Sequence, residues 1–247
     1  PLSFLKSNSY KGAAAAALAG PRLAWIVAFA AMSASAACTL DLAWRTLLLG
    51  APGVAEMGLS VDGIGAWSAA FAATASALVI VASVGVLRGD IAERAQPAAL
   101  ALVLVCAAGW IGACLARDLV GVFAAVETGW LACVGLVALS GERERGALTG
   151  ALRMLVHGGI GAAFTLVGVA MTARAIGAVD LARFETAAVP SPALAGAGLA
   201  LIFAGLGAKA GVAPFHLWVG AAFGRAGAVG AMLLGAVVTT SALALIV

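Results

Sequence analysis

Two ionisable residues lie deep inside long apolar runs of this sequence. Glu127 is flanked by the apolar stretches 119–126 and 128–139, and Lys209 lies between 199–208 and 210–213. A charge at the centre of a bilayer costs about 2.5–3.5 kcal/mol or more, so such side chains usually face a partner charge or a hydrated cavity. An acid and an amine that interact can change protonation state when their surroundings change. The pair could therefore serve as a proton relay, and a static ion pair that fixes helix packing is the alternative.

Two residues after Lys209 extend this interpretation. Pro214 follows the lysine by five positions and His216 by seven. Proline removes a backbone donor and would free the carbonyl of Ala210, four residues back. Irregular backbone at membrane depth is tolerated only beside protein or water. We therefore predict a discontinuous helix centred near Pro214 and lined by His216, whose imidazole titrates near physiological pH. A packing kink and a structural histidine are the alternatives.

Other polar residues offer weaker signals. His157 lies near the start of an apolar segment, where a hydrogen bond to a neighbouring helix is favoured over proton transfer. Thr239 and Thr240 lie in the middle of the last apolar segment, and their hydroxyls could hold water for a relay. Four cysteines form neither a CxxC pair nor a Cys/His cluster, so we interpret them as buried apolar residues and predict no metal site. They are Cys38, Cys106, Cys114 and Cys133.

The composition requires these residues to be placed by membrane helices. Of 247 residues, 64% are hydrophobic and 10% charged, against about 25% charged in soluble domains, and mean hydropathy is +1.11. Since a bilayer core needs about 20 apolar residues per helix, we predict an all-α polytopic bundle. About seven spans are expected, at 23–40, 62–87, 97–116, 119–140, 150–173, 193–219 and 227–247. Residues 1–22 form an N-terminal segment before this domain.

Lysine and arginine counts in the predicted loops give an orientation. Nine cations fall on the side of the N-terminus and four on the other, so the N-terminal side is expected to be cytoplasmic. The nine are Lys6, Lys11, Arg22, Arg88, Arg94, Arg143, Arg145, Arg153 and Arg225, and the four are Arg45, Arg117, Arg174 and Arg183. The net charge of +3 is spread through loops, without the basic patch that nucleic acid needs. The expected location is a bacterial-type inner membrane.

Several segments resemble one family of membrane proteins. The string Gly205-Leu-Gly-Ala-Lys-Ala-Gly-Val-Ala-Pro-Phe-His-Leu-Trp218 is similar to the lysine helix of the antiporter-like subunits. These occur in respiratory complex I, Mrp cation/proton antiporters and membrane-bound hydrogenases. Residues 117–139, around Glu127, resemble the family's glutamate helix. The stretch Gly58-Leu-Ser-Val-Asp62-Gly-Ile resembles the entry to an earlier helix of the family. The stretch from Leu152 to Gly168 resembles the family's glycine-rich helix that follows the glutamate helix.

The resemblance implies a fold and roles for residues. The family fold has about fourteen helices in two inverted repeats, each with a discontinuous helix, and this chain would cover the N-terminal helices and first repeat. Glu127 would modulate the lysine, Lys209 would be the central proton carrier, and His216 would line the broken helix. Partners would be other membrane subunits, and the transported ion H⁺ or Na⁺. The sequence has no flavin, iron–sulfur or nucleotide motif, so we expect no cofactor and place any redox chemistry in partners.

The sequence also departs from the family pattern. Val219-Gly220-Ala221-Ala222 replaces the usual leucine–proline continuation, and the next helix has Thr239 and Thr240 where a lysine or histidine is common. Three functions therefore stay open. The first is a proton-translocating subunit of a complex I-type, Mrp or hydrogenase complex, and the second a non-conducting structural or assembly subunit. The third is an unrelated secondary transporter with a midplane ion pair.

Overall fold

The chain folds into a bundle of long apolar helices, seen in a computed structural model that describes residues 11, 21–48, 63–140, 146–184 and 191–246. In these ranges seven helical segments are long and apolar enough to cross a membrane. They begin and end close to the predicted spans, because an apolar run in lipid satisfies its backbone hydrogen bonds only as a helix. The predicted N-terminal segment 1–22 and the motif Gly58–Asp62 lie almost wholly outside the described residues.

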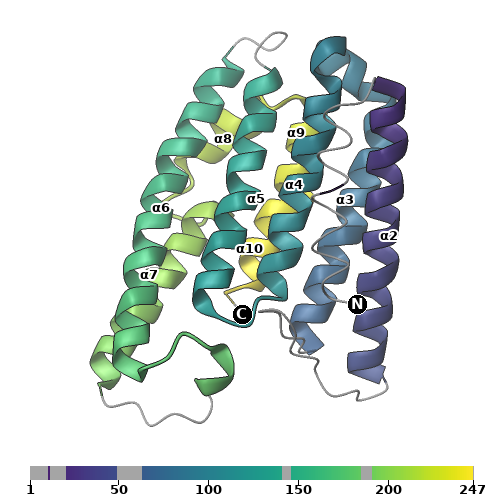
Figure 1. Cartoon of the computed structure of the whole chain (residues 1–247). Coiled ribbons are helices and arrows are strands. Elements are labelled where there is room, and N and C mark those ends of the chain that lie inside the picture. The colour runs from purple at the N-terminus through teal and green to yellow at the C-terminus, as the bar shows by residue number, and fades with distance from the viewer. Residues whose placement is uncertain (1–10, 12–20, 49–62, 141–145, 185–190, 247) are drawn as a thin grey trace.

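The first four spans follow one another as antiparallel neighbours (Figure 1). They are α2 (Pro21–Leu48), α3 (Gly63–Asp90), α4 (Gln96–Cys114) and α5 (Leu119–Leu139), with the short 3-10 helix η1 (Glu93–Ala95) before α4. The helix α2 runs eight residues beyond the predicted end at residue 40. Its last turns contain an i,i+4 ion pair, Arg45 Nε to Asp41 Oδ2 at 2.9 Å, so Arg45 belongs to the helix and not to a loop.

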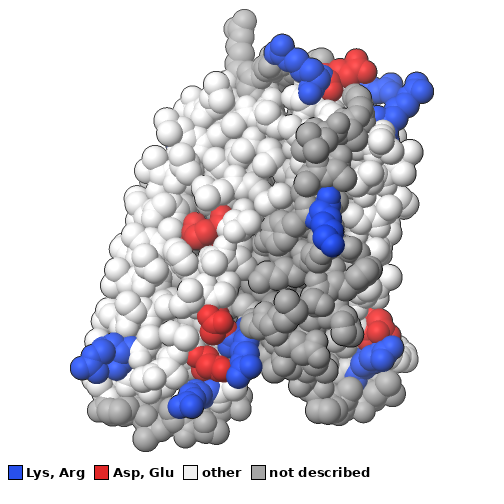
Figure 2. Space-filling model, viewed as in Figure 1, with Lys and Arg blue, Asp and Glu red and all other residues white. Residues whose placement is uncertain are grey.

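The second half of the chain contains the interrupted helix. After α6 (Ala147–Ile176) and the 3-10 turn η3 (Leu181–Arg183) come α7 (Pro192–Ala210) and α8 (Leu217–Phe223). The last span joins α9 (Gly227–Leu233), a π-helical segment η4 (Leu234–Thr239) and α10 (Thr240–Ala244). It packs behind α3, α4 and α5 (Figure 1). Figure 2 shows the charged side chains of one face gathered mainly toward the two ends, with a broad apolar middle.

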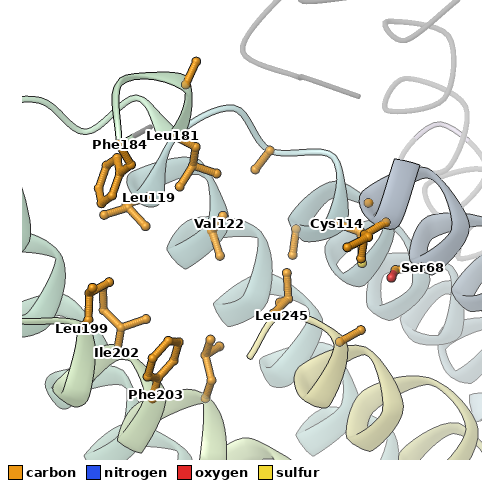
Figure 3. A pocket seen from close by; sticks show the side chains of 17 residues that line it. Ser68, Cys114, Leu119, Val122, Leu181, Phe184, Leu199, Ile202, Phe203 and Leu245 are labelled. Carbon is orange, nitrogen blue, oxygen red and sulfur yellow. The ribbon is translucent and has the colours of Figure 1, made fainter. Parts of the chain in front are cut away.

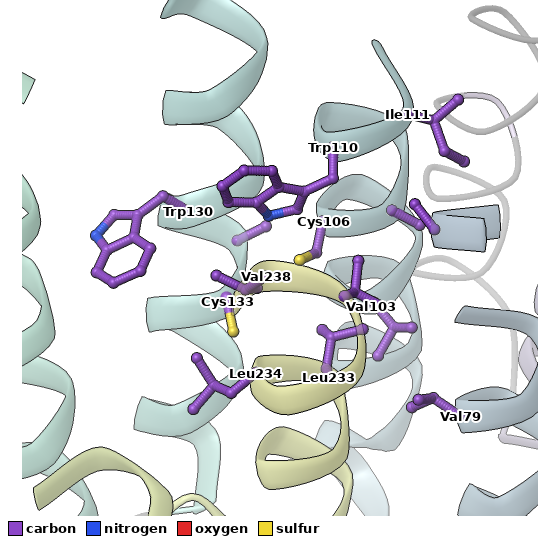
Figure 4. Close-up of a cluster of buried hydrophobic side chains, with 14 of the residues drawn as sticks. Val79, Val103, Cys106, Trp110, Ile111, Trp130, Cys133, Leu233, Leu234 and Val238 are labelled. Carbon is purple, nitrogen blue, oxygen red and sulfur yellow. The ribbon is translucent and has the colours of Figure 1, made fainter. Parts of the chain in front are cut away.

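The core of the bundle is built from aromatic, aliphatic and cysteine side chains. Figure 4 shows Trp110 and Cys106 of α4 facing Trp130 and Cys133 of α5, with Leu233, Leu234 and Val238 of the last span packed below. Backbone contact at one point lets α4 and α5 cross closely. A Cβ on Gly109 would lie 2.5 Å from the amide nitrogen of Gly129. Cys106 and Cys133 are fully buried free thiols, as expected from their apolar flanks, whereas Cys38 and Cys114 are only partly buried.

Small residues also bring α6 against α7 along most of their length. A Cβ on Gly168 would lie 2.5 Å from the carbonyl oxygen of Gly198, and one on Gly161 would lie 2.9 Å from that of Gly205. The same face of α6 continues past the interruption, where a Cβ on Gly150 would meet the carbonyl oxygen of Ala221 in α8 at 2.7 Å. Glycine at such positions allows two helix backbones to touch. α6 therefore holds both halves of the interrupted helix.

Two short loops are paired on the side of the bundle where α5 begins. The backbones of Asp118 and Asp180 form an isolated antiparallel bridge, and Arg117 Nε lies 2.8 Å from Asp180 Oδ2. Asp118 Oδ1 also accepts the Gly121 N–H at 2.8 Å and so caps α5. The backbone N–H of Ala182 and the nearby Arg117 guanidinium hold the pKa of the Asp180 carboxyl below its usual range. These contacts hold residues 179–182, which follow α6, against the start of α5.

Candidate functional site: a buried ion pair beside an interrupted helix

Glu127 and Lys209 meet inside the bundle. The Lys209 Nζ lies 3.0 Å from Glu127 Oε1 and donates a hydrogen bond to Oε2 at 3.2 Å. The lysine side chain is fully buried, while the glutamate side chain is 19% exposed. Two residues that are 82 positions apart in the sequence are thus in direct contact. A buried pair of this kind is costly to break, since the remaining charge would be left without a partner.

The helices explain why the two side chains reach each other at mid-depth. Glu127 is the ninth of the 21 residues of α5, and Lys209 lies in the last turn of α7. Because α8 carries the chain onward past the interruption, the end of α7 is in the middle of the bundle rather than at its edge. The partial negative charge at the carboxyl end of a helix also stabilises a cation there. The interruption thus places Lys209 where its ammonium is favoured.

The interruption itself begins with a glycine. α7 ends at Ala210, and Gly211 adopts a left-handed conformation with φ of 74°, which favours glycine. Pro214 lies within the turn that separates α7 from α8, so the interruption is where the sequence predicted it. The predicted cause was wrong in detail: the helix has already ended four residues before Pro214, so the proline does not free the Ala210 carbonyl of a continuing helix.

Three groups that the sequence reasoning missed complete the surroundings of the ammonium. Lys209 Nζ donates to the carbonyl oxygen of Gly158 in α6 at 3.3 Å and lies 4.8 Å from the centroid of the Trp130 ring. Trp218 of α8 packs edge-on against Trp130, with ring centroids 5.0 Å apart. Its indole N–H donates to the Ala208 carbonyl at 2.8 Å. A helical signal for one of them was present, since Trp130 follows Glu127 by three positions and so shares its face.

The other predicted residues lie around this centre without entering it. His157 Nδ1 bonds the Arg153 carbonyl oxygen of its own helix at 2.8 Å, and His216 is exposed beside the interruption. Thr239 donates to the Leu234 carbonyl at 2.9 Å, and Thr240 to the Ala236 carbonyl at 2.7 Å. Among the hydrogen bonds of the described ranges, these four side chains thus bond backbone or face outward, and only Glu127 of the predicted set contacts Lys209.

An apolar hollow lies near the paired loops, away from the ion pair. Its volume is about 550 Å³, and it is bounded by α5, α7, the η3 turn and the end of α10. Figure 3 shows Leu119 and Val122 facing Leu199, Ile202 and Phe203 across it, with Leu181 and Phe184 at its edge. Among the described residues its lining carries no Asp, Glu, His, Lys or Arg, and its one titratable side chain is the Cys114 thiol. The described residues contain no group of three or more His, Cys, Asp or Glu that could hold a metal.

A family model matches the part of the chain that contains this site. The model is described as "NADH:quinone oxidoreductase/Mrp antiporter, TM", and it matches residues 116–247, more than half of the chain. The chain belongs to this family. Membership confirms the resemblance seen in the lysine and glutamate helices, and it agrees with a multi-pass membrane protein.

Curated relatives in this family cover most of the chain. NADH-quinone oxidoreductase subunit N of Cereibacter sphaeroides is 32% identical over 229 residues, which is 91% of this chain and 47% of that protein. Subunit N of Rhodopseudomonas palustris is 35% identical over 187 residues, 74% of this chain and 37% of that protein. The chain therefore spans about half the length or less of these relatives.

Solved structures share the fold of this chain. A chain of respiratory complex I from Thermus thermophilus superposes with a TM-score of 0.79 at 24% identity, covering 98% of this chain and 51% of that one. A chain of an archaeal membrane-bound sulfane sulfur reductase superposes with a TM-score of 0.84 at 20% identity, covering 98% of this chain and 51% of that one. A chain of the Mrp complex from Dietzia sp. superposes with a TM-score of 0.78 at 22% identity, covering 99% of this chain and 47% of that one. At these identities the likeness establishes the antiporter-like fold.

Proposed function

We propose that this chain is a proton-translocating antiporter-like membrane subunit of a complex I-type NADH:quinone oxidoreductase or a related Mrp or hydrogenase complex. The observation that carries the proposal is the contact between the Glu127 carboxylate and the fully buried Lys209 ammonium. Ionisable groups inside membrane spans usually mark ion pathways. Family membership and subunit N relatives support the assignment.

The pair can pass a proton because each charge stabilises the other. A proton that reaches Glu127 neutralises the carboxylate and leaves the Lys209 ammonium without its counter-charge. The lysine then gives up its proton more readily, and loss of the proton from Glu127 restores the attraction. The Gly158 carbonyl can hold the lysine amine in place in both states, since it accepts from either form. Energy for the cycle would come from partner subunits of a larger complex.

The membrane and its orientation belong to the same proposal. The subunit lies in a bacterial-type inner membrane with the N-terminal side of α2 in the cytoplasm. The excess of lysine and arginine on that side, nine residues against four, supports this orientation. His216 and Pro214 line the interruption next to Lys209, and water held near Thr239 and Thr240 would carry the proton onward. Other membrane subunits, with the bilayer and H⁺ or Na⁺, are the partners.

A substitution of the lysine tests the proposal. In the intact complex, reconstituted in vesicles, Lys209→Met is expected to abolish ion uptake, and Lys209→Arg to retain part of it because the charge remains. The matched control is Arg183→Met, which removes an exposed cation of the η3 turn. Unchanged uptake in an assembled Lys209→Met complex would refute the role of Lys209. Parallel assays with H⁺ and Na⁺ would identify the ion.

One observation favours a second function, a non-conducting structural or assembly subunit. The segment η4 has no ionisable side chain, and Thr239 and Thr240 bond backbone carbonyls of their own helix. A relay onward from Lys209 would then lack a titratable station. In that case Lys209→Met would impair assembly of the complex, and the complexes that do assemble would transport ions as well as the wild type.

A further inference from the structure

The buried indole of Trp130 lies against the ammonium of Lys209. Trp130 is 1% exposed, and the Lys209 Nζ lies 4.8 Å from the centroid of its ring. The face of an indole carries negative charge density and attracts a cation within about 6 Å, most strongly where water is excluded. The fully buried lysine side chain meets that condition. The contact is therefore an energetic one and not only a packing contact.

Three groups attract the ammonium, and only one of them can change its charge. They are the Glu127 carboxylate, the Gly158 carbonyl and the Trp130 ring. When the carboxylate is protonated, the carbonyl and the ring are the groups that still attract the cation. An ammonium in a dry site with a single hydrogen bond would lose its proton at once. The ring supplies an attraction that is independent of the protonation of Glu127.

We propose that Trp130 is a positioning residue for proton transfer, which keeps Lys209 charged during the step in which Glu127 is neutral. This inference rests on the proposed function and adds to it. The ring separates two events that would otherwise coincide, arrival of a proton at Glu127 and its departure from Lys209. Because the protonated Glu127 cannot accept a second proton, the delay keeps the ammonium in place until its proton can leave by a route other than the glutamate.

The ring is held in this position from two sides. A Cβ on Gly158 would overlap the Trp130 Nε1, so a glycine at this position of α6 leaves room for the indole. The Trp218 ring contacts the Trp130 ring at 5.0 Å with planes 89° apart, and Trp218 is itself bonded to the carbonyl of Ala208, the residue before the lysine. The indole is therefore fixed relative to α6 and to the end of α7 together.

Other titratable or charged groups on the surrounding helices do not take its place. Within the described ranges, these groups are Cys133 on α5, Cys106 and Cys114 on α4, Arg153, His157 and Arg174 on α6, and His216 beyond α7. Cys106 and Cys133 face each other as free thiols, Cys114 lines the apolar hollow, His157 bonds the Arg153 carbonyl, and Arg153, Arg174 and His216 are exposed. Among the described residues Glu127 is the one acid in contact with Lys209, so the Gly158 carbonyl and the Trp130 ring are the attractions that remain when it is protonated.

Fluorinated tryptophans at position 130 test the proposal without changing the shape of the side chain. Each added fluorine withdraws charge from the ring face and weakens its attraction for a cation. In vesicles with the intact complex, we expect the alkaline limb of the pH profile of H⁺ uptake to move to lower pH with each fluorine. The full shift, reached with Trp130→Leu, should be about one pH unit. The alkaline limb of Trp130→Phe should lie between that of the wild type and that of Trp130→Leu.

Controls separate the ring from general packing. Fluorinated tryptophan at Trp110 is the matched control, because this ring is equally buried but packs on Gly129 and not on the lysine. A pH profile that does not move with fluorination at position 130, in a complex that Lys209→Met inactivates, would refute the role of Trp130 alone. Uptake that survives Lys209→Met would instead refute the proposed function on which it rests.

Discussion

Two adjacent glycines of α6 allow a direct test of how the ion pair is assembled. A Cβ on Gly158 would overlap the Trp130 indole, whereas a Cβ on Gly159 would meet nothing within 4 Å. Gly158→Ala must therefore push the indole or α6 away, and with it the carbonyl that accepts from Lys209. Gly159→Ala adds the same methyl group one position further along the same helix, where there is open space.

The expected magnitude follows from two opposing effects. Alanine is favoured over glycine in a helix by about 0.8–1 kcal/mol, and both variants share this gain. Overpacking in a filled core costs about 1–3 kcal/mol, and only Gly158→Ala incurs it. The free energies of unfolding of the two variants should therefore differ by about 1–3 kcal/mol, with Gly159→Ala equal to or above the wild type. Equilibrium unfolding by SDS in mixed micelles would measure the difference.

The same variants should differ in ion uptake. Displacement of the indole and of the Gly158 carbonyl changes two of the three groups around the lysine, so uptake should fall in Gly158→Ala and not in Gly159→Ala. Equal stability and equal uptake of the two variants would contradict the packing described for Trp130. A loss of both stability and ion uptake in Gly159→Ala would show that position 159, and not position 158, faces the bundle.

Three further results are expected. Gly205→Ala should destabilise the protein by about 1–3 kcal/mol relative to Gly196→Ala in SDS unfolding, because a Cβ at position 205 would meet α6 and one at 196 meets nothing within 4 Å. Asp90→Ala should cost about 1 kcal/mol by the same assay, since its carboxylate accepts a backbone N–H of α9 at 3.1 Å. The Asp180 carboxyl has a lowered pKa, so its stabilisation of the α6–α7 loop is complete above the ordinary aspartate value of about 3.9 and lost as the pH falls through the lowered value. The protection factors for amide exchange of residues 177–184, that is, exchange rates corrected for the intrinsic effect of pH, should fall in acid for the wild type. In Asp180→Asn they should already be low at neutral pH, and equal protection of the two proteins at neutral pH would contradict this.

The spans and the key pair could be predicted from the sequence because lipid imposes strict rules. Runs of about 20 apolar residues must become helices, and a mid-run acid and base must find polar surroundings. These rules placed most spans within a few residues, apart from the end of α2 and the end of α7 at the interruption, and they singled out Glu127 and Lys209, which contact each other. The rules fail at helix ends, where Asp41 and Arg45 pair along α2 and extend it beyond the apolar run.

The surroundings of the pair could not be predicted in the same way. The Gly158 carbonyl is a backbone group, and which glycine of α6 meets the lysine depends on how two helices rotate against each other. Trp130 and Trp218 look like ordinary core residues, because an indole near a cation has the same local sequence as an indole in a core. Pro214 gave the place of the interruption, but α7 is ended by Gly211, whose left-handed conformation depends on the path of the chain between α7 and α8.

The seam of glycines between α6 and the two halves of the interrupted helix has a mechanical consequence. With backbone against backbone at positions 150, 161 and 168, there is no layer of flexible side chains that could yield, and sliding would drive carbonyl oxygens into Cα atoms. We expect α6, α7 and α8 to move as one rigid body during any working cycle. Motion that alternates the exposure of Lys209 must then arise elsewhere, at α5 with its glutamate or at the π-helical turn η4, whose looser winding permits a local change of register.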